Sequence, residues 1–169
     1  STSPLLGRSN TSTTLGGPLA TTNLSKIIDL PHNRRMFYGH LLDLINTSYN
    51  TTVLAPFIEN YTRLTKFETL ETFFNNYINN RVDFVLSELD NVAPQIPFEI
   101  TTNNGEDFEA SNTIVTIEGD GWIDVHEIRL AGSQLPLEVI WTDQDSWQVA
   151  MPVTFGANSM VLEAYNFQG

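Results

Sequence analysis

Three acidic turns in the second half of the chain hold the residue types best suited to binding a cation. They comprise residues 103–107, 119–121 and 143–145. Carboxylate, amide and backbone oxygens are the hard ligands that Ca²⁺ prefers, so the calcium candidates are Asp120, Asp143 and Asp145. None of these turns has the spacing of an EF-hand loop. Asparagine and aspartate also form ordinary Asx turns, which is the alternative interpretation.

The histidines and serines favour no catalytic site. His32 and His40 are eight residues apart, whereas two metal ligands on one helix face usually lie four apart. Ser146, Asp145 and His126 could form a hydrolase triad on paper, but the chain lacks a G-x-S-x-G motif. Paired carboxylates for glycoside hydrolysis would need a concave site, which strand edges and turns do not offer. We therefore expect no catalytic residue in this chain.

Tryptophan is the residue type that could bind a sugar by stacking. Trp141 and Trp147 fall on alternating segments, so we expect them in the core of a sheet. Trp122 follows a turn and is the best candidate for an exposed ring. It is therefore the possible sugar-stacking residue.

Helical periodicity organises the residues between 26 and 94. A first helix is expected at about 31–47, with Asp29 as N-cap and Pro31 in its first turn. Its apolar face would consist of Phe37, Leu41, Leu44 and Ile45. Arg34 and Arg35 lie early in this helix, where the dipole disfavours cations. We therefore expect these two side chains to meet a partner across the fold, such as a carboxylate.

Two further helices are expected at about 52–63 and 66–90. The first has an apolar face that contains Val53, Phe57, Ile58 and Tyr61. The second begins with a capping box at residues 65–68. Its aromatic and aliphatic stripe could line a ligand groove but is more often core; the stripe contains Leu70, Phe73, Phe74, Tyr77, Ile78, Val82, Phe84, Val85 and Leu89.

Residues 95–169 alternate between apolar and polar positions and predict short antiparallel strands. The segments are 98–101, 113–118, 122–130, 137–141, 147–153 and 159–165, with 119–121 as a turn. Short strands at this spacing are typical of an antiparallel sandwich. The predicted fold is thus α+β in series, with a small helical subdomain of about three helices at 26–94 followed by a β-sandwich at 95–169.

Composition limits the classes of partner. The net charge is −12, and residues 95–169 carry twelve acids against the single basic residue Arg129, which argues against nucleic acid. No apolar run is long enough to span a bilayer, and without cysteine the chain has no disulfide. Residues 1–25 are rich in Ser, Thr, Gly and Pro and predict an extended arm that orders on contact.

The run S-W-Q-V-A-M-P-V-T-F-G-A-N-S-M-V-L-E-A-Y-N-F-Q-G at 146–169 resembles the end of bacterial immunoglobulin-like domains of secreted proteins. In those domains a polar tight turn leads into a last strand, and this chain stops at Gly169, where that strand would begin. The resemblance implies an immunoglobulin-like β-sandwich that lacks its last strand and exposes an edge along 159–165. Met160, Leu162 and Ala164 would then contact a partner polypeptide by β-augmentation.

The segment from Leu5 to Leu89 resembles the C-terminal part of the spore-coat protein H family, an atypical kinase-like fold. The similar features are S-P-L-L at 3–6, Pro18-Leu19, P-H-N-R-R-M-F-Y at 31–38, Tyr49-Asn50 and the later long helix. The family's nucleotide-binding lysine, catalytic aspartate and metal-binding aspartates would all lie upstream of Ser1. The resemblance therefore implies no cofactor in this chain, and Mg²⁺ and ATP for the parent protein alone.

Together the two resemblances imply an extracellular or cell-envelope protein. Our first hypothesis is a C-terminal portion of a secreted kinase-like multidomain protein, non-catalytic by itself. Its helices would buttress the phosphotransfer lobe, and its sandwich would be a spacer or docking module. The expected partner is the remainder of its own precursor, contacted in part by Leu5 and Leu6, or another polypeptide. The alternatives are a structural or adhesive envelope module and a carbohydrate-binding β-sandwich.

Overall fold

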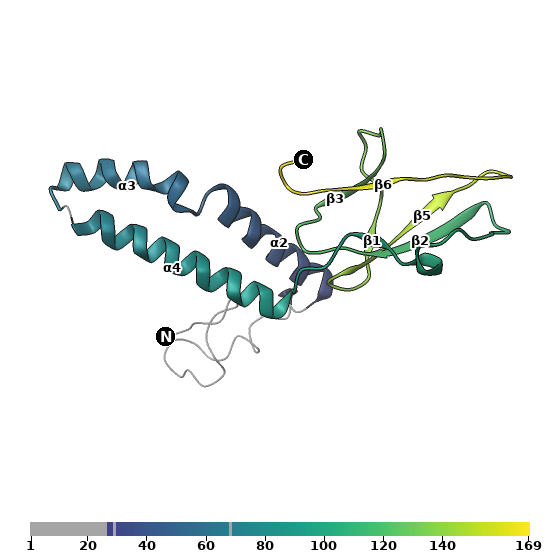
Figure 1. The fold of residues 1–169 in the computed structure, drawn as a ribbon, viewed down its shortest axis with the longest axis horizontal. Helices are drawn as coiled ribbons and strands as arrows, with labels where there is room; N and C mark the ends of the chain where they lie inside the picture. The colour runs from purple at the N-terminus through teal and green to yellow at the C-terminus, as the bar shows by residue number, and fades with distance from the viewer. Residues whose placement is uncertain (1–26, 29, 68) are drawn as a thin grey trace. The chain divides into compact units, whose positions relative to one another are not determined.

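The computed structural model describes residues 27–28, 30–67 and 69–169, which form three helices followed by antiparallel sheets (Figure 1). The chain is therefore α+β in series, as predicted. The helices are α2 (Pro31–Thr47), α3 (Thr51–Thr65) and α4 (Thr69–Val92). A short 3-10 helix, η2 (Thr102–Gly105), accompanies the strands, which are β1 (Glu99–Ile100), β2 (Ile114–Asp120), β3 (Glu127–Leu130), β4 (Ile140–Trp141), β5 (Ser146–Pro152) and β6 (Leu162–Tyr165).

The contacts between residues divide the described chain into two units. His40–Val92 belong to a helical unit, and Ile28–Gly39 together with Ala93–Gly169 belong to a β unit. The first turns of α2 are thus part of the β unit, although they precede the helical unit in the chain.

Local capping fixes the limits of α3. The side chain of Asn50 accepts a hydrogen bond from the backbone N–H of Val53 at 3.0 Å, which satisfies one free donor of the first turn. Lys66 ends the helix in the left-handed conformation, with φ 58°. The capping box predicted at 65–68 is wrong, because Thr65 closes α3 and its hydroxyl donates to the carbonyl of Tyr61. Helix α4 begins later, at Thr69.

The buried face of α2 differs from the predicted one. Tyr38, Leu42 and Ile45 are buried together with Arg35, whereas Leu44 is 47% exposed. These four buried positions lie three or four residues apart and share one side of the helix. Of the predicted apolar face, Ile45 is buried, Phe37 and Leu41 are half-buried, and only Leu44 is exposed. The apolar pattern missed Arg35 because it gave no weight to a buried arginine.

The aliphatic part of the predicted stripe on α4 is core, since Ile78, Val85 and Leu89 are buried. The aromatic part is not, and the apolar face predicted for α3 is also largely exposed. Seven large apolar side chains of these two helices are exposed, and we call them the aromatic surface. They are Val53, Phe57, Tyr61 and Leu64 on α3 and Phe73, Phe74 and Tyr77 on α4.

The strands of the β unit form two antiparallel sheets. One has four strands in the order β1-β2-β5-β4, and the other has the two strands β3 and β6. Strands β2 and β5 pair from Ile114↔Pro152 to Asp120↔Ser146. The turn predicted at 119–121 is wrong, because Gly119 and Asp120 are paired residues of β2.

Gly119 is required by close packing rather than by a turn. A Cβ atom at this position would collide with the indole ring of Trp147 and with the carbonyl oxygen of Glu99. Glycine in a strand often marks such a close approach of two chain segments. Here it lets Trp147 lie flat against β2.

The core of the β unit draws on both sheets. Trp147 is 1% exposed, stacks on Phe98 with ring centroids 5.5 Å apart, and was correctly predicted to be internal. Trp141 is partly buried against the same cluster. The buried members are Val115, Ile117, Val125, Ile128, Trp147, Val149 and Met151.

Arg35 is the polar centre of the β unit. Its Nη1 donates to the carbonyl oxygens of Gly121 and Gln144 at 2.9 and 2.8 Å. Its Nη2 donates to those of Trp122 and Val125 at 2.6 and 2.8 Å. The guanidinium carbon lies 3.2 Å from the centroid of the Trp141 ring, which adds a cation–π contact.

The charge of Arg35 survives its burial. Desolvation lowers the pKa of Arg35 to about 10, while the negative charges of Asp145 and Asp124 act in the opposite direction. This side chain is therefore still protonated at neutral pH. The carboxylates that we expected as partners act through space, and backbone carbonyls are the direct acceptors.

We predict that Arg35→Met lowers the free energy of unfolding by roughly 3 kcal/mol or more, because buried carbonyls lose their donors. Arg35→Lys keeps the charge but cannot reproduce the planar fork, so it should also destabilise the chain. Denaturant unfolding measures both effects. Arg63→Lys is the control, since Arg63 is exposed and its guanidinium donates to the side chain of Asn60. Wild-type stability in Arg35→Met would contradict this account.

Candidate functional site

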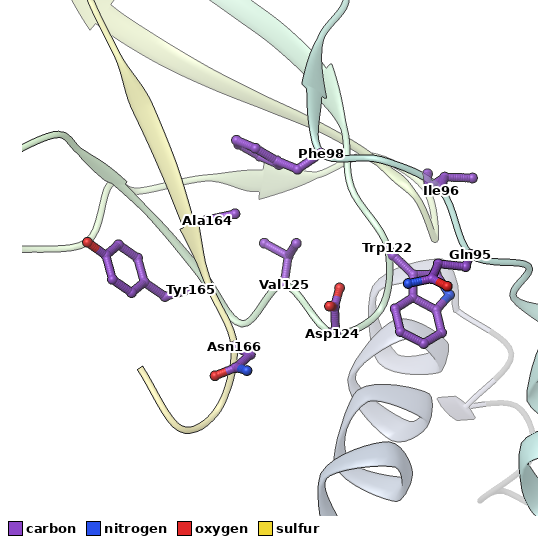
Figure 2. Close-up of a pocket in the computed structure, with 9 residues that line it drawn as sticks. All are labelled: Gln95, Ile96, Phe98, Trp122, Asp124, Val125, Ala164, Tyr165 and Asn166. Atoms are coloured by element: carbon purple, nitrogen blue, oxygen red, sulfur yellow. The ribbon is translucent and has the colours of Figure 1, made fainter. Parts of the chain in front are cut away.

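A pocket with a volume of about 240 Å³ lies within the β unit (Figure 2). It is bounded by the chain that leads into β1, the connection between β2 and β3, and the end of β6. The lining residues are Gln95, Ile96, Phe98, Trp122, Asp124, Val125, Ala164, Tyr165 and Asn166. It is somewhat smaller than the roughly 300 Å³ at which drug-sized sites begin.

Trp122 forms part of the pocket lining, half-buried, with its ring held in place. Its indole N–H donates to the carbonyl oxygen of Ala93 at 2.7 Å, so this donor is already used. Asp124 provides the one carboxylate among the lining residues. A single carboxylate does not provide the acid–base pair of a glycosidase.

The pairing of β6 with β3 shows which side chains of β6 face the core and which face outward. Leu162 and Ala164 pair with Leu130 and Ile128 and share their face, because cross-strand partners point to the same side. Ile128 is 1% exposed, so this is the inner face. Ala164 is nevertheless exposed. An inward-pointing residue is therefore left uncovered on the flank away from β3.

The outer face of the same pair is polar, although the Nε of Arg129 is buried without a hydrogen-bond partner. Arg129 forms an ion pair with Glu127 and lies over the ring of Tyr165 at 4.3 Å. The hydroxyl of Tyr165 donates to Glu163 at 2.9 Å. The alternation along β6 is thus regular, and the exposure of Ala164 does not arise from a slipped register.

The backbone of β6 is paired on one side. The carbonyl oxygens of Val161 and Tyr165 accept hydrogen bonds from Ala131 and His126, at 2.9 and 2.8 Å. Because the peptide groups of an antiparallel strand alternate in direction, those of Leu162 and Ala164 point away from β3. Within the described residues, β3 is the one strand that pairs with β6. The outer flank of β6 is therefore an open sheet edge.

A tight turn follows this open edge. The carbonyl oxygen of Asn166 accepts from the N–H of Gly169 at 3.2 Å, and its side chain accepts from the N–H of Gln168 at 2.9 Å. The ring of Phe167 stacks on His126 with centroids 4.3 Å apart. The turn reverses the chain at the end of β6 and is held against the β unit by this stack.

The calcium candidates lie near the backbone groups that hold Arg35. Asp120 accepts a hydrogen bond from the hydroxyl of Ser146 at 2.8 Å, and Asp143 accepts from the N–H of Gln144. Asp145 is adjacent to Gln144, whose carbonyl binds Arg35. The Arg35 guanidinium thus binds backbone carbonyls next to these carboxylates, and calcium binding stays a prediction.

The third acidic turn is organised by its own amide side chain. The Nδ2 of Asn103 donates to the carbonyl oxygens of Glu106 and Asp107, at 3.3 and 2.8 Å. Asn103 and Asn104 both adopt positive φ, which asparagine tolerates better than most residues. In residues 27–28, 30–67 and 69–169, no group of three or more His, Cys, Asp or Glu side chains is placed to hold a metal ion.

Ser146 and His126, two members of the hydrolase triad considered from the sequence, have other contacts. The hydroxyl of Ser146 donates to Asp120, and a hydroxyl has one proton to give. The ring of His126 is engaged with Phe167 instead.

The predicted partner-contacting residues are only partly described. Met160 and Leu162 are half-buried against the core and Ala164 is exposed, whereas Leu5 and Leu6 lie outside the described residues. Sequence reasoning missed the pocket because it joins three segments far apart in the chain. It also missed that Arg35 binds carbonyls, although its unfavourable place in α2 was a usable signal.

Comparison of the chain with protein-family models, curated proteins and solved structures found no match. Among the described helices, none combines the length and apolarity needed to cross a membrane.

We predict that Glu163→Gln lowers the pKa of Tyr165. The hydrogen bond to Glu163 is the main cause that raises this pKa above its ordinary value, because the bond and the negative charge both favour the protonated phenol. Titration of the tyrosine ring by NMR measures the change. Glu138→Gln, on a residue absent from the causes of the shift, is the matched control. An unchanged titration in Glu163→Gln would show that the two side chains do not interact in solution.

Proposed function

We propose that this chain is a non-catalytic docking portion of a secreted, kinase-like multidomain protein. In this proposal the open edge of β6 accepts one more strand from the remainder of its own precursor or from another polypeptide. The helical unit acts as a buttress against the phosphotransfer lobe. The protein would work at the cell envelope or outside the cell.

Strand order supports an immunoglobulin-like β-sandwich for the β unit. In the constant-type immunoglobulin fold, the first, second, fifth and fourth strands form one sheet, and the third, sixth and seventh form the other. The sheets β1-β2-β5-β4 and β3-β6 have this order for six strands. The seventh strand of that fold would lie against β6, on its open flank.

The single observation that carries the proposal is the state of Ala164. This residue faces inward yet is exposed, and its peptide groups point away from the one strand that pairs with β6. Open sheet edges are hazardous for a secreted protein because they recruit other strands. An added strand would cover the side chain and satisfy the backbone in one step.

The helical unit supports the second part of the proposal. Tyr61 and Leu64 are 70% and 77% exposed, and the other members of the aromatic surface are between 39% and 61% exposed. Large exposed apolar side chains that gather on a monomeric protein often mark contacts with other polypeptides. A buttress packed against a further lobe would bury such side chains.

We predict alternating hydrogen exchange along β6 in this chain. The amides of Leu162 and Ala164 should exchange fast, and those of Glu163 and Tyr165 slowly, because only the latter point toward β3. In the protein purified from its native source, the first two amides should become protected. Equal protection of all four amides in the isolated, monomeric chain would reject an open edge.

A pair of proline variants provides the control. Ala164→Pro removes an N–H that faces outward, so the chain should fold while strand addition is lost. Glu163→Pro removes an N–H that faces β3 and should unfold the β3–β6 pair. If Ala164→Pro destabilises this chain as much as Glu163→Pro, the assignment of the open flank is wrong.

A carbohydrate-binding role is the second candidate, because Trp122 does line a pocket together with Asp124 and the amides of Gln95 and Asn166. An aromatic face beside polar groups is a common arrangement for binding a small polar ligand. Oligosaccharides should then quench the fluorescence of Trp122, and Trp122→Phe should remove the quenching. Trp141→Phe is the comparison. Quenching that persists in Trp122→Phe would exclude this pocket as a sugar site.

A further inference from the structure

We infer that the pocket in the β unit binds a ligand through one alkylammonium group, which pairs with the carboxylate of Asp124 beside the ring of Trp122. A free small amine and the lysine side chain of a polypeptide both carry this group. The inference goes beyond the proposed function and does not depend on it, because it concerns the pocket and not the open edge of β6.

The charge of the pocket lining is negative and comes from Asp124. Among the described residues that line the pocket, none is a lysine, an arginine or a histidine. The side chain of Asp124 is half-buried, so its carboxylate has lost part of its hydration. A charge that is partly removed from water is stabilised most by an opposite charge next to it. The lining therefore favours a cation over an anion or a neutral molecule.

The buried cation of the β unit, Arg35, leaves this carboxylate available to a ligand. Each Nη atom of Arg35 donates to two backbone carbonyl oxygens, so none of their four protons remains for Asp124. The negative charges of Asp124 and Asp145 both act on the same guanidinium through space. One positive charge thus stands against two negative charges. Within the described part of the chain, the carboxylate of Asp124 accepts no hydrogen bond.

The ring of Trp122 offers a ligand an aromatic surface and no free donor. Its indole N–H is already bound to the carbonyl oxygen of Ala93, and Figure 2 shows the ring beside the side chain of Asp124. A cation over the face of an aromatic ring is attracted by the ring quadrupole, most strongly for tryptophan. A carboxylate next to an indole therefore favours an ammonium group.

The other lining residues suit the alkyl part of such a ligand. Phe98, Val125 and Ala164 present apolar groups to the pocket (Figure 2), and covering them with methylene groups removes apolar area from water. The amide oxygen of Gln95, an exposed residue of the lining, is a second acceptor for an ammonium group, which has three donors and no acceptor. A volume of about 240 Å³ has room for a short alkyl chain.

The experiment compares two probes of equal length, n-butylamine, which is protonated at neutral pH, and n-butanol, which is uncharged. Each is titrated into the isotope-labelled chain while NMR follows the indole N–H of Trp122 and the methyl groups of Val125. Butylammonium should shift both sets of resonances and should bind roughly tenfold or more tightly than butanol, because only the cation pairs with the carboxylate and the ring. Added salt should weaken the binding of butylammonium and not that of butanol.

Three variants separate the local charge from the net charge of the chain. Asp124→Asn keeps the size of the side chain and should lower the affinity for butylammonium roughly tenfold, to near that of butanol. Asp107→Asn is the matched control, because it changes the net charge equally at an exposed residue outside the lining and should leave the affinity unchanged. Asp124→Glu keeps the charge and should retain most of the binding. The amide spectrum of each variant shows whether it is folded.

Two further probes distinguish the sources of the ammonium group. They are Nα-acetyl-lysine methylamide and its uncharged norleucine analogue. Tighter binding of the lysine compound than of butylammonium would support a polypeptide side chain as the ligand, and equal or weaker binding would support a free amine. In both cases the norleucine analogue should bind more weakly than the lysine compound.

Three results would overturn the inference. They are equal affinity for butylammonium and butanol, unchanged affinity in folded Asp124→Asn, and binding of neutral oligosaccharides to a pocket that does not bind butylammonium. The last result would favour the carbohydrate-binding role instead. None of them bears on strand addition at β6, which hydrogen exchange tests separately.

Discussion

The guanidinium of Arg35 is the constraint on which the β unit depends. Its four hydrogen bonds reach the carbonyls of Gly121, Trp122, Val125 and Gln144. These groups belong to the connection between β2 and β3 and to the turn before β5. Because a buried cation needs acceptors on all sides, the loops are held in a single arrangement. That arrangement places Trp122 and Val125 in the pocket lining, so the candidate site is positioned by a residue that does not line it.

The pocket, the open flank of β6 and the turn at 166–169 adjoin one another. Ala164 belongs to two of them, since it lines the pocket and directs its peptide groups outward. Phe167 secures the third by stacking on His126. All three features therefore involve residues 162–169, in β6 or directly after it.

Local patterns in the sequence predicted the order of the elements and most of their limits. Alternation located the strands and the internal position of Trp147, and helical spacing located α2, α3 and α4. The sequence failed where contacts are distant. Leu44 was assigned to the apolar face of its helix but is exposed, and Gly119 suggested a turn although it accommodates Trp147. The exposed aromatic residues of α3 and α4 fit an apolar period equally well whether a core or another surface covers them.

The β unit is discontinuous in the chain, because α3 and α4 separate its first portion, 28–39, from its second, 93–169. Gene fusion that transfers residues 93–169 alone would leave behind the cation that closes their loops. This constrains how such a module can spread among genes by recombination. The β unit must be inherited together with α3 and α4. Otherwise it must acquire another donor for the carbonyl oxygens that now bind Arg35.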